Sequence, residues 1–361
     1  MEDLERTVAQ LNAVLSPAGD VGEPGAAIGL VSGDMGEQVR RILFATSLTD
    51  HVVDEAIAAG VELLVVLTGP HRIQLVGARG RLLRRLIRAD IALFNARHAA
   101  DNLISRAIAE LLGIGPCRPL IAEPGAQYAV LIAYTPEENA EPLRQALASA
   151  GAGAMGDYTG CAWSVTGMGE FTPQVGADPT IGEVGAHEQV SERRLEMVVP
   201  LSAIAPVTEA LRRAHPYEEP AFSFVAVHPA PGRSGRGRVG DLPQATTLAG
   251  LAHRLGQELP AAPIRTTGGE GDYGRLAVAA GADEEVVFAA AGAGAHVLVS
   301  ADISADLLDA AHSVNLALID VPRAQLSWPA LPILAREVAA VTNGEVETIV
   351  STSFTASWTP T

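Results

Sequence analysis

The sequence contains no lysine, and all 25 of its basic residues are arginines. This absence excludes Schiff-base chemistry and the lysine of a phosphate-binding P-loop. Cysteine is almost as scarce, since Cys117 and Cys161 stand alone without a Cys-x-x-Cys pair. Two isolated cysteines are typical of small buried residues in a reducing compartment.

Charge and hydrophobic runs exclude further classes of protein. The formal net charge of −17 argues against nucleic-acid backbones and anionic membranes as partners. No apolar run is long enough to cross a bilayer. The acidic amphipathic start, residues 1–15, lacks the basic residues and apolar stretch of a signal peptide. We therefore expect a cytoplasmic globular protein, and a length of 361 residues favours more than one domain.

Strand and helix signals alternate from residue 41 to about residue 124. The strand signal at 42–48 precedes a helix that Thr49 caps and Gly60 terminates. A strand at 62–68, an arginine-rich helix at 81–89, a strand at 91–96 and a helix at 99–113 follow. This rhythm predicts βαβ units and a largely parallel sheet.

Residues 125–230 predict a different order, β-α-β-β-α-β, which is the ferredoxin-like plan. "TPEE" at 135–138 resembles a capping box, with Pro136 at the first helical position. The Gly-, Pro- and Arg-rich residues 229–243 predict a linker, after which the α/β rhythm resumes. The predicted fold class is α/β: a split α/β domain, residues 1–124 and 231–361, interrupted by an inserted ferredoxin-like α+β domain, residues 125–230.

Two glycine strings and one arginine cluster do not predict binding sites. The GxGxxG string at 151–156 follows a helix and the one at 269–274 precedes a strand, whereas a dinucleotide loop joins a strand to a helix. The arginines of helix 81–89 face away from a predicted apolar stripe and are expected to be its solvated side. That stripe comprises Leu82, Leu83, Leu86 and Ile87.

The histidines and one acidic turn offer weaker patterns. His71 and His98 each follow a strand end, and Asp101 lies close after His98. Imidazole and carboxylate ligands suit zinc or manganese, so this set could hold one divalent ion, with surface or capping roles as the alternative. In "HPYEEPAF", residues 215–222, we expect a structural corner with Tyr217 packed inward, because adjacent carboxylates point in different directions in an extended segment.

Five strings together resemble one family. They are "GLVSGD" (29–34), "GRLLRRLIRADIALFNA" (80–96), "GMGEFTPQVGADPTIGEVG" (167–185), "AHPYEEPAF" (214–222) and "LALIDV" (316–321). In order and spacing they are similar to the Nif-three-like proteins, dinuclear-metal-centre hexamers often labelled type-two GTP cyclohydrolase homologues. The resemblance implies a split Nif-three-like α/β domain, an inserted domain similar to the PII and CutA proteins, and a toroid of six chains.

The resemblance also implies a set of metal ligands, from which this chain departs. The family's His-His-Pro corresponds to Thr68-Gly69-Pro70, and its His-Thr-Asn-x-Asp corresponds to residues 97–101, "RHAAD". The histidine and glutamate that the family places after "LIDV" correspond to Arg323 and Ser327. Of these implied ligands, only Asp101 remains.

Two fixed cations at ligand positions would oppose metal loading by Coulomb repulsion, and they could instead neutralise the remaining aspartate. We therefore expect no cofactor, and a non-catalytic scaffold or a protein that binds an anionic small molecule. The predicted pocket at the former metal site comprises Thr68, Gly69, His71, Arg97, His98, Asp101, Arg323 and Ser327.

Other functions stay open. If the chain is an enzyme, the resemblance implies a metal-dependent hydrolase that acts on a nucleotide or phosphoester, with zinc, manganese or iron in a rearranged site. His71 and His98 would then be substitute ligands. A third hypothesis is a subunit that assembles with a metal-bearing paralogue. We expect further copies of the chain as partners, in a hexamer, and neither nucleic acid nor membrane.

Overall fold

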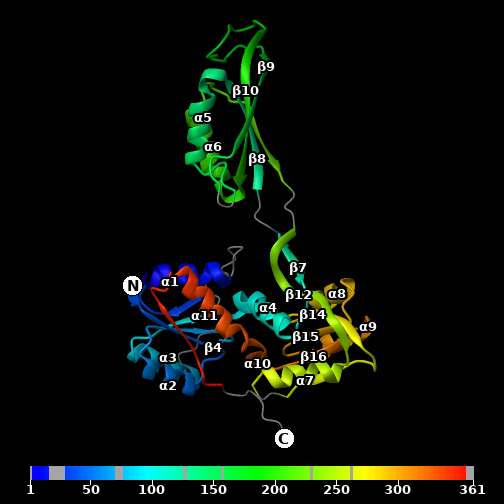
Figure 1. The fold of residues 1–361 in the computed structure, drawn as a ribbon. Coiled ribbons are helices and arrows are strands. Elements are labelled where there is room, and N and C mark those ends of the chain that lie inside the picture. Colours follow the sequence, from blue (N-terminus) through cyan, green and yellow to red (C-terminus); the bar gives the residue numbers. More distant parts are fainter. Residues whose placement is uncertain are drawn as a thin grey trace. The chain divides into compact units, whose positions relative to one another are not determined.

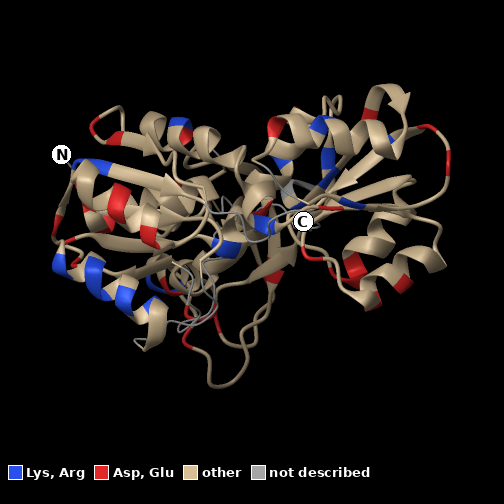
Figure 2. Ribbon diagram, turned by 90° about the horizontal axis from the view of Figure 1, so that it is seen from below, with Lys and Arg blue, Asp and Glu red and all other residues tan. Residues whose placement is uncertain are grey.

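The computed structural model describes residues 2–15, 29–69, 76–124, 128–155, 158–227, 231–260 and 263–354. The chain divides into two compact units (Figure 1). The first unit combines Met1–Glu123 with Arg233–Thr361, and the second comprises Pro124–Gly232. Acidic and basic positions are interspersed over the elements (Figure 2). None of the helices in the described part of the chain combines the length and apolarity that crossing a lipid bilayer requires.

The first sheet of the first unit is mostly parallel. β4, β5, β6 and β17 run parallel, and β2 joins the edge antiparallel to β6. In sheet order the strands are β17 (Glu347–Val350), β4 (Arg41–Ala45), β5 (Leu63–Val66), β6 (Ala92–Asn95) and β2 (Gly29–Ser32). β1 (Glu2–Asp3) and β3 (Gln38–Val39) form a separate two-stranded ribbon.

Helices cover both faces of this sheet because alternate strand residues are buried on opposite sides. Leu43 and Leu64 pack in one cluster with α2 (Asp50–Ala59) and α3 (Gly77–Arg88), whereas Phe44 belongs to a second cluster on the other face. That second cluster includes side chains from α1 (Leu4–Leu15), α4 (Asp101–Leu111) and α11 (Ala330–Val341).

The second sheet of the first unit mixes strands from both ends of the chain. β14, β15 and β16 run parallel, and β12 and β13 pair antiparallel to β14 and β16. In sheet order the strands are β13 (Arg265–Thr267), β16 (Ala317–Asp320), β15 (Val297–Ser300), β14 (Tyr273–Val278), β12 (Pro231–Thr246) and β7 (Arg118–Pro124). The associated helices are α7 (Leu248–Glu258), α8 (Glu284–Gly292), α9 (Ala305–Ser313) and α10 (Arg323–Ser327).

Helix α4 joins the two sheets of the first unit. Its buried residues Leu103, Ile104 and Ile108 share one hydrophobic cluster with Phe44 of the first sheet and Val299 of the second. Figure 1 shows α4 between the two sets of strands. Because α4 begins at Asp101, this packing brings the aspartate to the region where both sheets meet.

The second unit is a four-stranded antiparallel sheet with two helices on one face (Figure 1). The sheet order is β11-β8-β10-β9, and Leu131, Leu195 and Met197 pack against Leu143 and Leu211 of the helices. In chain order the elements are β8 (Tyr128–Pro136), η2 (Glu137–Asn139), α5 (Ala140–Ser149), β9 (Ala162–Phe171), β10 (Glu188–Pro200), η3 (Leu201–Ala203), α6 (Ile204–Ala214) and β11 (Phe222–Ala226).

Two local predictions were wrong. Thr135 does not cap a helix: it lies in β8 opposite Arg193, and α5 begins only at Ala140, after a short turn. Strand pairing therefore overrides the capping signal of "TPEE". Ile87 is not part of the buried stripe of α3, because 54% of its surface is exposed.

The predicted linker at 229–243 was also wrong. From Pro231 it forms β12, which pairs with β14 through Arg238 to Asp241. Gly240 allows close packing there, since a Cβ on it would lie 2.7 Å from Ile114 Cγ2. Cys117 and Cys161 are both unpaired, and both are half-buried and not fully enclosed.

Candidate functional site

The candidate site lies where strands of both sheets end. Thr68 and Gly69 follow β5, and a 3₁₀ turn, η1 (Arg97–Ala100), follows β6 and leads into α4. Arg323 begins α10 just after β16. Carboxyl ends of parallel strands are where α/β proteins place their ligand groups. Pro70 and His71 lie outside the described residues, so the structure does not test the prediction for His71.

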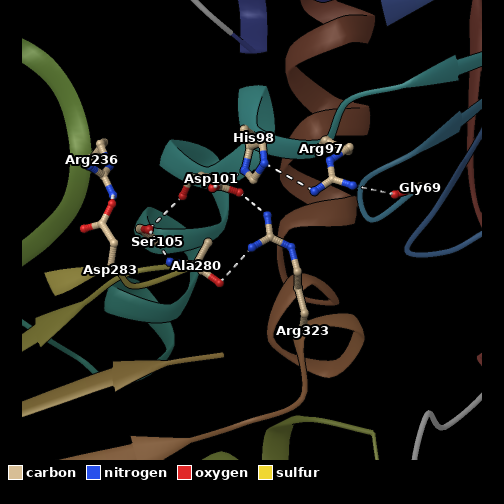
Figure 3. Close-up of polar contacts among 9 residues, drawn as sticks. All are labelled: Gly69, Arg97, His98, Asp101, Ser105, Arg236, Ala280, Asp283 and Arg323. Carbon is tan, nitrogen blue, oxygen red and sulfur yellow. Dashed lines mark hydrogen bonds and ion pairs between the residues drawn. The ribbon is translucent and has the colours of Figure 1, made fainter. Parts of the chain in front are cut away.

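Asp101 is held by two neighbours (Figure 3). Its Oδ1 accepts a hydrogen bond from Arg323 Nη2, and its Oδ2 lies 3.3 Å from His98 Nδ1. The side chains of Asp101 and Arg323 are 24% and 20% exposed, so this ion pair is largely shielded from water. Shielding makes the attraction between the two charges stronger than at an open surface.

Arg323 also connects to a third segment. Its Nη1 donates to the carbonyl oxygen of Ala280, just after β14, at 3.1 Å. Ser105 Oγ on α4 donates to the Asp101 carbonyl at 2.7 Å and accepts from the Ala280 amide at 3.1 Å. The guanidinium therefore ties together α10, the start of α4 and the segment after β14 (Figure 3).

Arg97 points to the other side of the same cluster (Figure 3). Its φ of 37° lies in the left-handed region, which costs a non-glycine residue roughly 1–3 kcal/mol. Nη1 donates to the Gly69 carbonyl at 3.4 Å, and Nη2 lies 3.3 Å from His98 Nε2. Burial and the neighbouring Arg323 cation lower the pKa of the Arg97 guanidinium, while Asp101 acts in the opposite direction.

His98 joins the two parts of this network. A guanidinium can only donate hydrogen bonds, so His98 Nε2 must be the acceptor of the contact with Arg97. The ring then carries its proton on Nδ1, which faces Asp101 Oδ2. The cluster of Arg97, His98, Asp101 and Arg323, which we call the arginine site, therefore has two fixed cations around one carboxylate.

Two other predicted site residues direct their hydroxyls to the backbone. Thr68 Oγ1 donates to the Thr46 carbonyl at 2.6 Å, and Ser327 Oγ donates to the Arg323 carbonyl at 2.7 Å. Gly69 leaves no room for a side chain, since a Cβ would lie 2.2 Å from Asn95 Oδ1. The sequence reasoning missed Ser105 and Ala280. Ser105 had a signal, because it lies one helical turn after Asp101, whereas nothing local marks Ala280.

Metal-ligating side chains do not gather in the described part of the chain. There, no group of three or more His, Cys, Asp and Glu residues could hold a metal ion.

The fold and the site define an α/β protein with one mostly parallel sheet and one mixed sheet, joined by a central helix, and with a polar cluster at their strand ends. A family model described as Duf34/NIF3 (NGG1p interacting factor 3) matches residues 4–356, so the chain belongs to this family. The resemblance to Nif-three-like proteins is thereby confirmed, together with a mixed α/β fold of several sheets.

Relatives of this chain share most of its length. It is 37% identical over 315 residues to a Mycobacterium leprae protein named "GTP cyclohydrolase 1 type 2 homolog", covering 84% of this chain and 81% of that one. A Bacillus subtilis protein of the same name is 33% identical over 308 residues, 82% of each chain.

Two solved structures are also similar to this chain over nearly its whole length. A Bacillus cereus protein related to NIF3 is similar with a TM-score of 0.73 at 26% identity, covering 100% of this chain and 99% of that one. A Staphylococcus aureus protein has a TM-score of 0.81 at 21% identity over 100% and 99% of the chains, a likeness that concerns the fold alone.

Proposed function

We propose that this chain is a Nif-three-like protein in which an internal ion pair replaces the metal centre, and that it is a non-catalytic scaffold or binds a small anion at the arginine site. One observation carries the proposal. Asp101 stands at the family ligand position that this sequence retains. Its Oδ1 accepts a hydrogen bond from Arg323, which itself stands at a ligand position.

The chemistry of the donor set does not fit two divalent ions. A guanidinium has no lone pair to offer a metal, and it would repel a dication at short range. Arg97 and Arg323 both stand where the family supplies imidazole, and both lie within one cluster (Figure 3). Arg323 instead links three segments through Asp101 and Ala280, as a bridging ion would.

The charge of the arginine site favours an anionic ligand. Two guanidiniums, those of Arg97 and Arg323, lie in one cluster with the carboxylate of Asp101. Arg97 Nη1 contacts the Gly69 carbonyl at 3.4 Å, and its Nη2 lies 3.3 Å from His98 Nε2. A carboxylate or phosphate offers paired oxygens that match the guanidinium fork and form stronger, charge-assisted hydrogen bonds.

The competing function is a metal-dependent hydrolase that acts on a nucleotide or phosphoester. His98 Nδ1 lies 3.3 Å from Asp101 Oδ2, and the curated relatives carry a GTP cyclohydrolase homologue name. In that case His71 and His98 would be the substitute ligands for zinc, manganese or iron.

Metal content distinguishes the two functions. The full chain is purified without chelator, incubated with zinc, manganese or iron, desalted and measured by plasma mass spectrometry, with Asp101→Ala as the control. We expect background metal in both proteins. Near-stoichiometric metal that falls in the variant would overturn the proposal and favour the hydrolase. Titration of the wild-type chain with inorganic phosphate then separates an anion-binding protein from a scaffold.

We further propose that the second unit is an inserted ferredoxin-like domain of the PII/CutA type, with boundaries near residues 125 and 230. The element order β8-α5-β9-β10-α6-β11 and the sheet order β11-β8-β10-β9 support this assignment.

We also propose that six chains assemble into a homo-hexamer. Native mass spectrometry tests this: a single species of six chain masses is expected, and a mixed composition in the source cells would favour co-assembly with a metal-bearing paralogue.

A further inference from the structure

The second unit contains a cavity of about 510 Å³ that the arginine site does not use. It lies between the end of β9 with the segment after it and the turn that precedes β11. Two of the strings that carry the family resemblance, 167–185 and 214–222, meet here. The Asp178 amide donates to Glu218 Oε2 at 3.1 Å, and Thr180 Oγ1 donates to the Pro216 carbonyl at 2.9 Å.

The walls of this cavity carry charge of one sign. Among the described residues that line it, every charged one is acidic, namely Glu170, Asp178, Glu192, Glu218 and Glu219. Glu170 lies 3.7 Å from His187. Within the described residues, no arginine lies at ion-pair distance from the other four lining carboxylates. Arg193, which is next to Glu192 in the chain, pairs with Glu137 instead. The described lining of the cavity is therefore electronegative.

Aromatic rings and glycine give the cavity a fixed shape. The ring centroids of Phe171 and Tyr217 are 6.3 Å apart, and Tyr217 Oη donates to Glu192 Oε1 at 3.0 Å. Burial and Glu192 raise the pKa of Tyr217, which keeps the phenol a neutral donor. A Cβ on Gly169 would lie 2.3 Å from Glu192 Oε2, so the glycine makes room for that carboxylate. His215 Nδ1 accepts the Tyr217 amide at 3.1 Å, which holds the turn in place.

The lack of a converging ligand group among the described residues distinguishes between two kinds of cation. A divalent metal needs several ligands converging on one point, and the described His, Cys, Asp and Glu residues form no such group. The acidic groups instead line a cavity large enough for an organic molecule. Separated carboxylates suit separated ammonium or guanidinium groups, and aromatic faces attract such cations and cover the apolar carbons between them.

We propose that this cavity binds a small linear organic polycation of the polyamine class. The cationic ends contact the carboxylates of Glu192 and Glu219, and the methylene chain lies against Phe171 and Tyr217. The inference concerns the second unit alone and is independent of the function proposed for the arginine site.

Isothermal titration of the full chain with spermidine, at physiological salt, tests the proposal. Two variants carry the same change in charge: Glu192→Gln with Glu219→Gln in the cavity, and Glu141→Gln with Glu209→Gln on the helices outside it. We expect saturable binding of one spermidine per chain, with affinity about tenfold lower for each cavity carboxylate removed, because hydrogen bonds to charged groups are of that strength. The helix pair should keep the wild-type affinity.

Two controls separate a built site from general attraction to an acidic protein. Butylamine, which has one charge, should bind at least about tenfold more weakly than spermidine, and magnesium chloride should not displace spermidine at equal concentration. Absence of saturable binding, equal losses in the two variant pairs, or displacement by magnesium at equal concentration would each overturn the proposal. Circular dichroism of each variant checks that the second unit stays folded.

Discussion

At the scale of single residues, the ion pair between Asp101 and Arg323 is the feature on which the arginine site depends. Removing the negative charge leaves two guanidiniums close together in a partly buried cluster, with the Arg323 contact to Asp101 weakened. We predict that Asp101→Asn lowers the free energy of unfolding by about 1–3 kcal/mol. Denaturant titration measures this change.

Asp54→Asn is the matched control for that measurement. Asp54 also pairs with an arginine, Arg85, but its side chain is 62% exposed. Exposed pairs contribute little, so we expect a loss below about 1 kcal/mol. Equal losses in the two variants would show that the Asp101 pair is no more important than an ordinary surface contact.

The proposed replacement of the metal centre can also be reversed. Arg97→His, Arg323→His and Ser327→Glu together restore three implied family ligands around Asp101 and remove both cations. We predict that this triple variant acquires about one zinc or manganese ion per chain, because imidazole and carboxylate donors then converge on one carboxylate. Plasma mass spectrometry after metal incubation measures the content.

The control for the triple variant removes the cations without adding good ligands: Arg97→Gln, Arg323→Gln and Ser327→Gln. It should stay at background metal. If both triple variants load metal equally, the loss of positive charge alone would explain the result, and the role assigned to the restored ligands would be wrong.

At the scale of elements, hydrogen bonds to one carboxylate of α2 hold the segment that follows β17. Glu55 accepts hydrogen bonds from Ser351 Oγ, from the amide and hydroxyl of Thr352, and from the Ser353 amide. Burial acts to raise the pKa of Glu55, but these hydrogen bonds outweigh it and lower the pKa below the ordinary value of 4.5. These hydrogen bonds therefore depend on the ionised form of Glu55.

This arrangement predicts a pH-dependent release of the chain after β17. A depressed pKa in the folded state means that the stabilisation is complete above pH 4.5 and is lost as the pH falls through the lower folded value. Hydrogen exchange at the Thr352 and Ser353 amides should accelerate over that range, beyond the intrinsic pH effect. In Glu55→Gln, exchange should be fast throughout and show no such step; a step that persists in the variant would assign the titration to another group.

The sequence predicted elements well where the local signal and the packing agree. Thr49 caps α2, Gly60 ends it in the left-handed conformation, and both roles are readable from residue type alone. Prediction from the sequence failed at Thr135 and at 229–243, where strand pairing with distant residues decides the structure. A Gly- and Arg-rich string has the composition of a linker, and only its partner strand β14 makes it a strand.

At the scale of the whole molecule, the candidate site also combines features that the sequence predicts with features that only the packing determines. Asp101 and Arg323 are 222 residues apart, so no pattern of spacing could place them in contact. What brought both into the predicted pocket was the resemblance of two separate strings to one family. The contributions of Ser105 and Ala280 stayed hidden because they depend on how α4 packs between the two sheets.

The division of the chain into two units leads to a final prediction. The strands that enter and leave the second unit, β7 and β12, are neighbours in one sheet, so their ends can be joined by a short connection. The buried clusters of the first unit consist of its own residues, and those of the second unit likewise. Replacing residues 125–231 by a short Gly-Ser linker should therefore leave the first unit able to fold cooperatively, since loop closure costs little for a flexible linker.

Circular dichroism and thermal denaturation of this deletion variant measure the outcome. A single cooperative transition, together with a loss of stability in Asp101→Asn made in the deleted background, is expected if the arginine site belongs to the first unit alone. A broad, non-cooperative transition would show that the first unit needs the second in order to fold. The spermidine titration should give no binding in the deletion variant, because every residue that lines the acidic cavity has been removed.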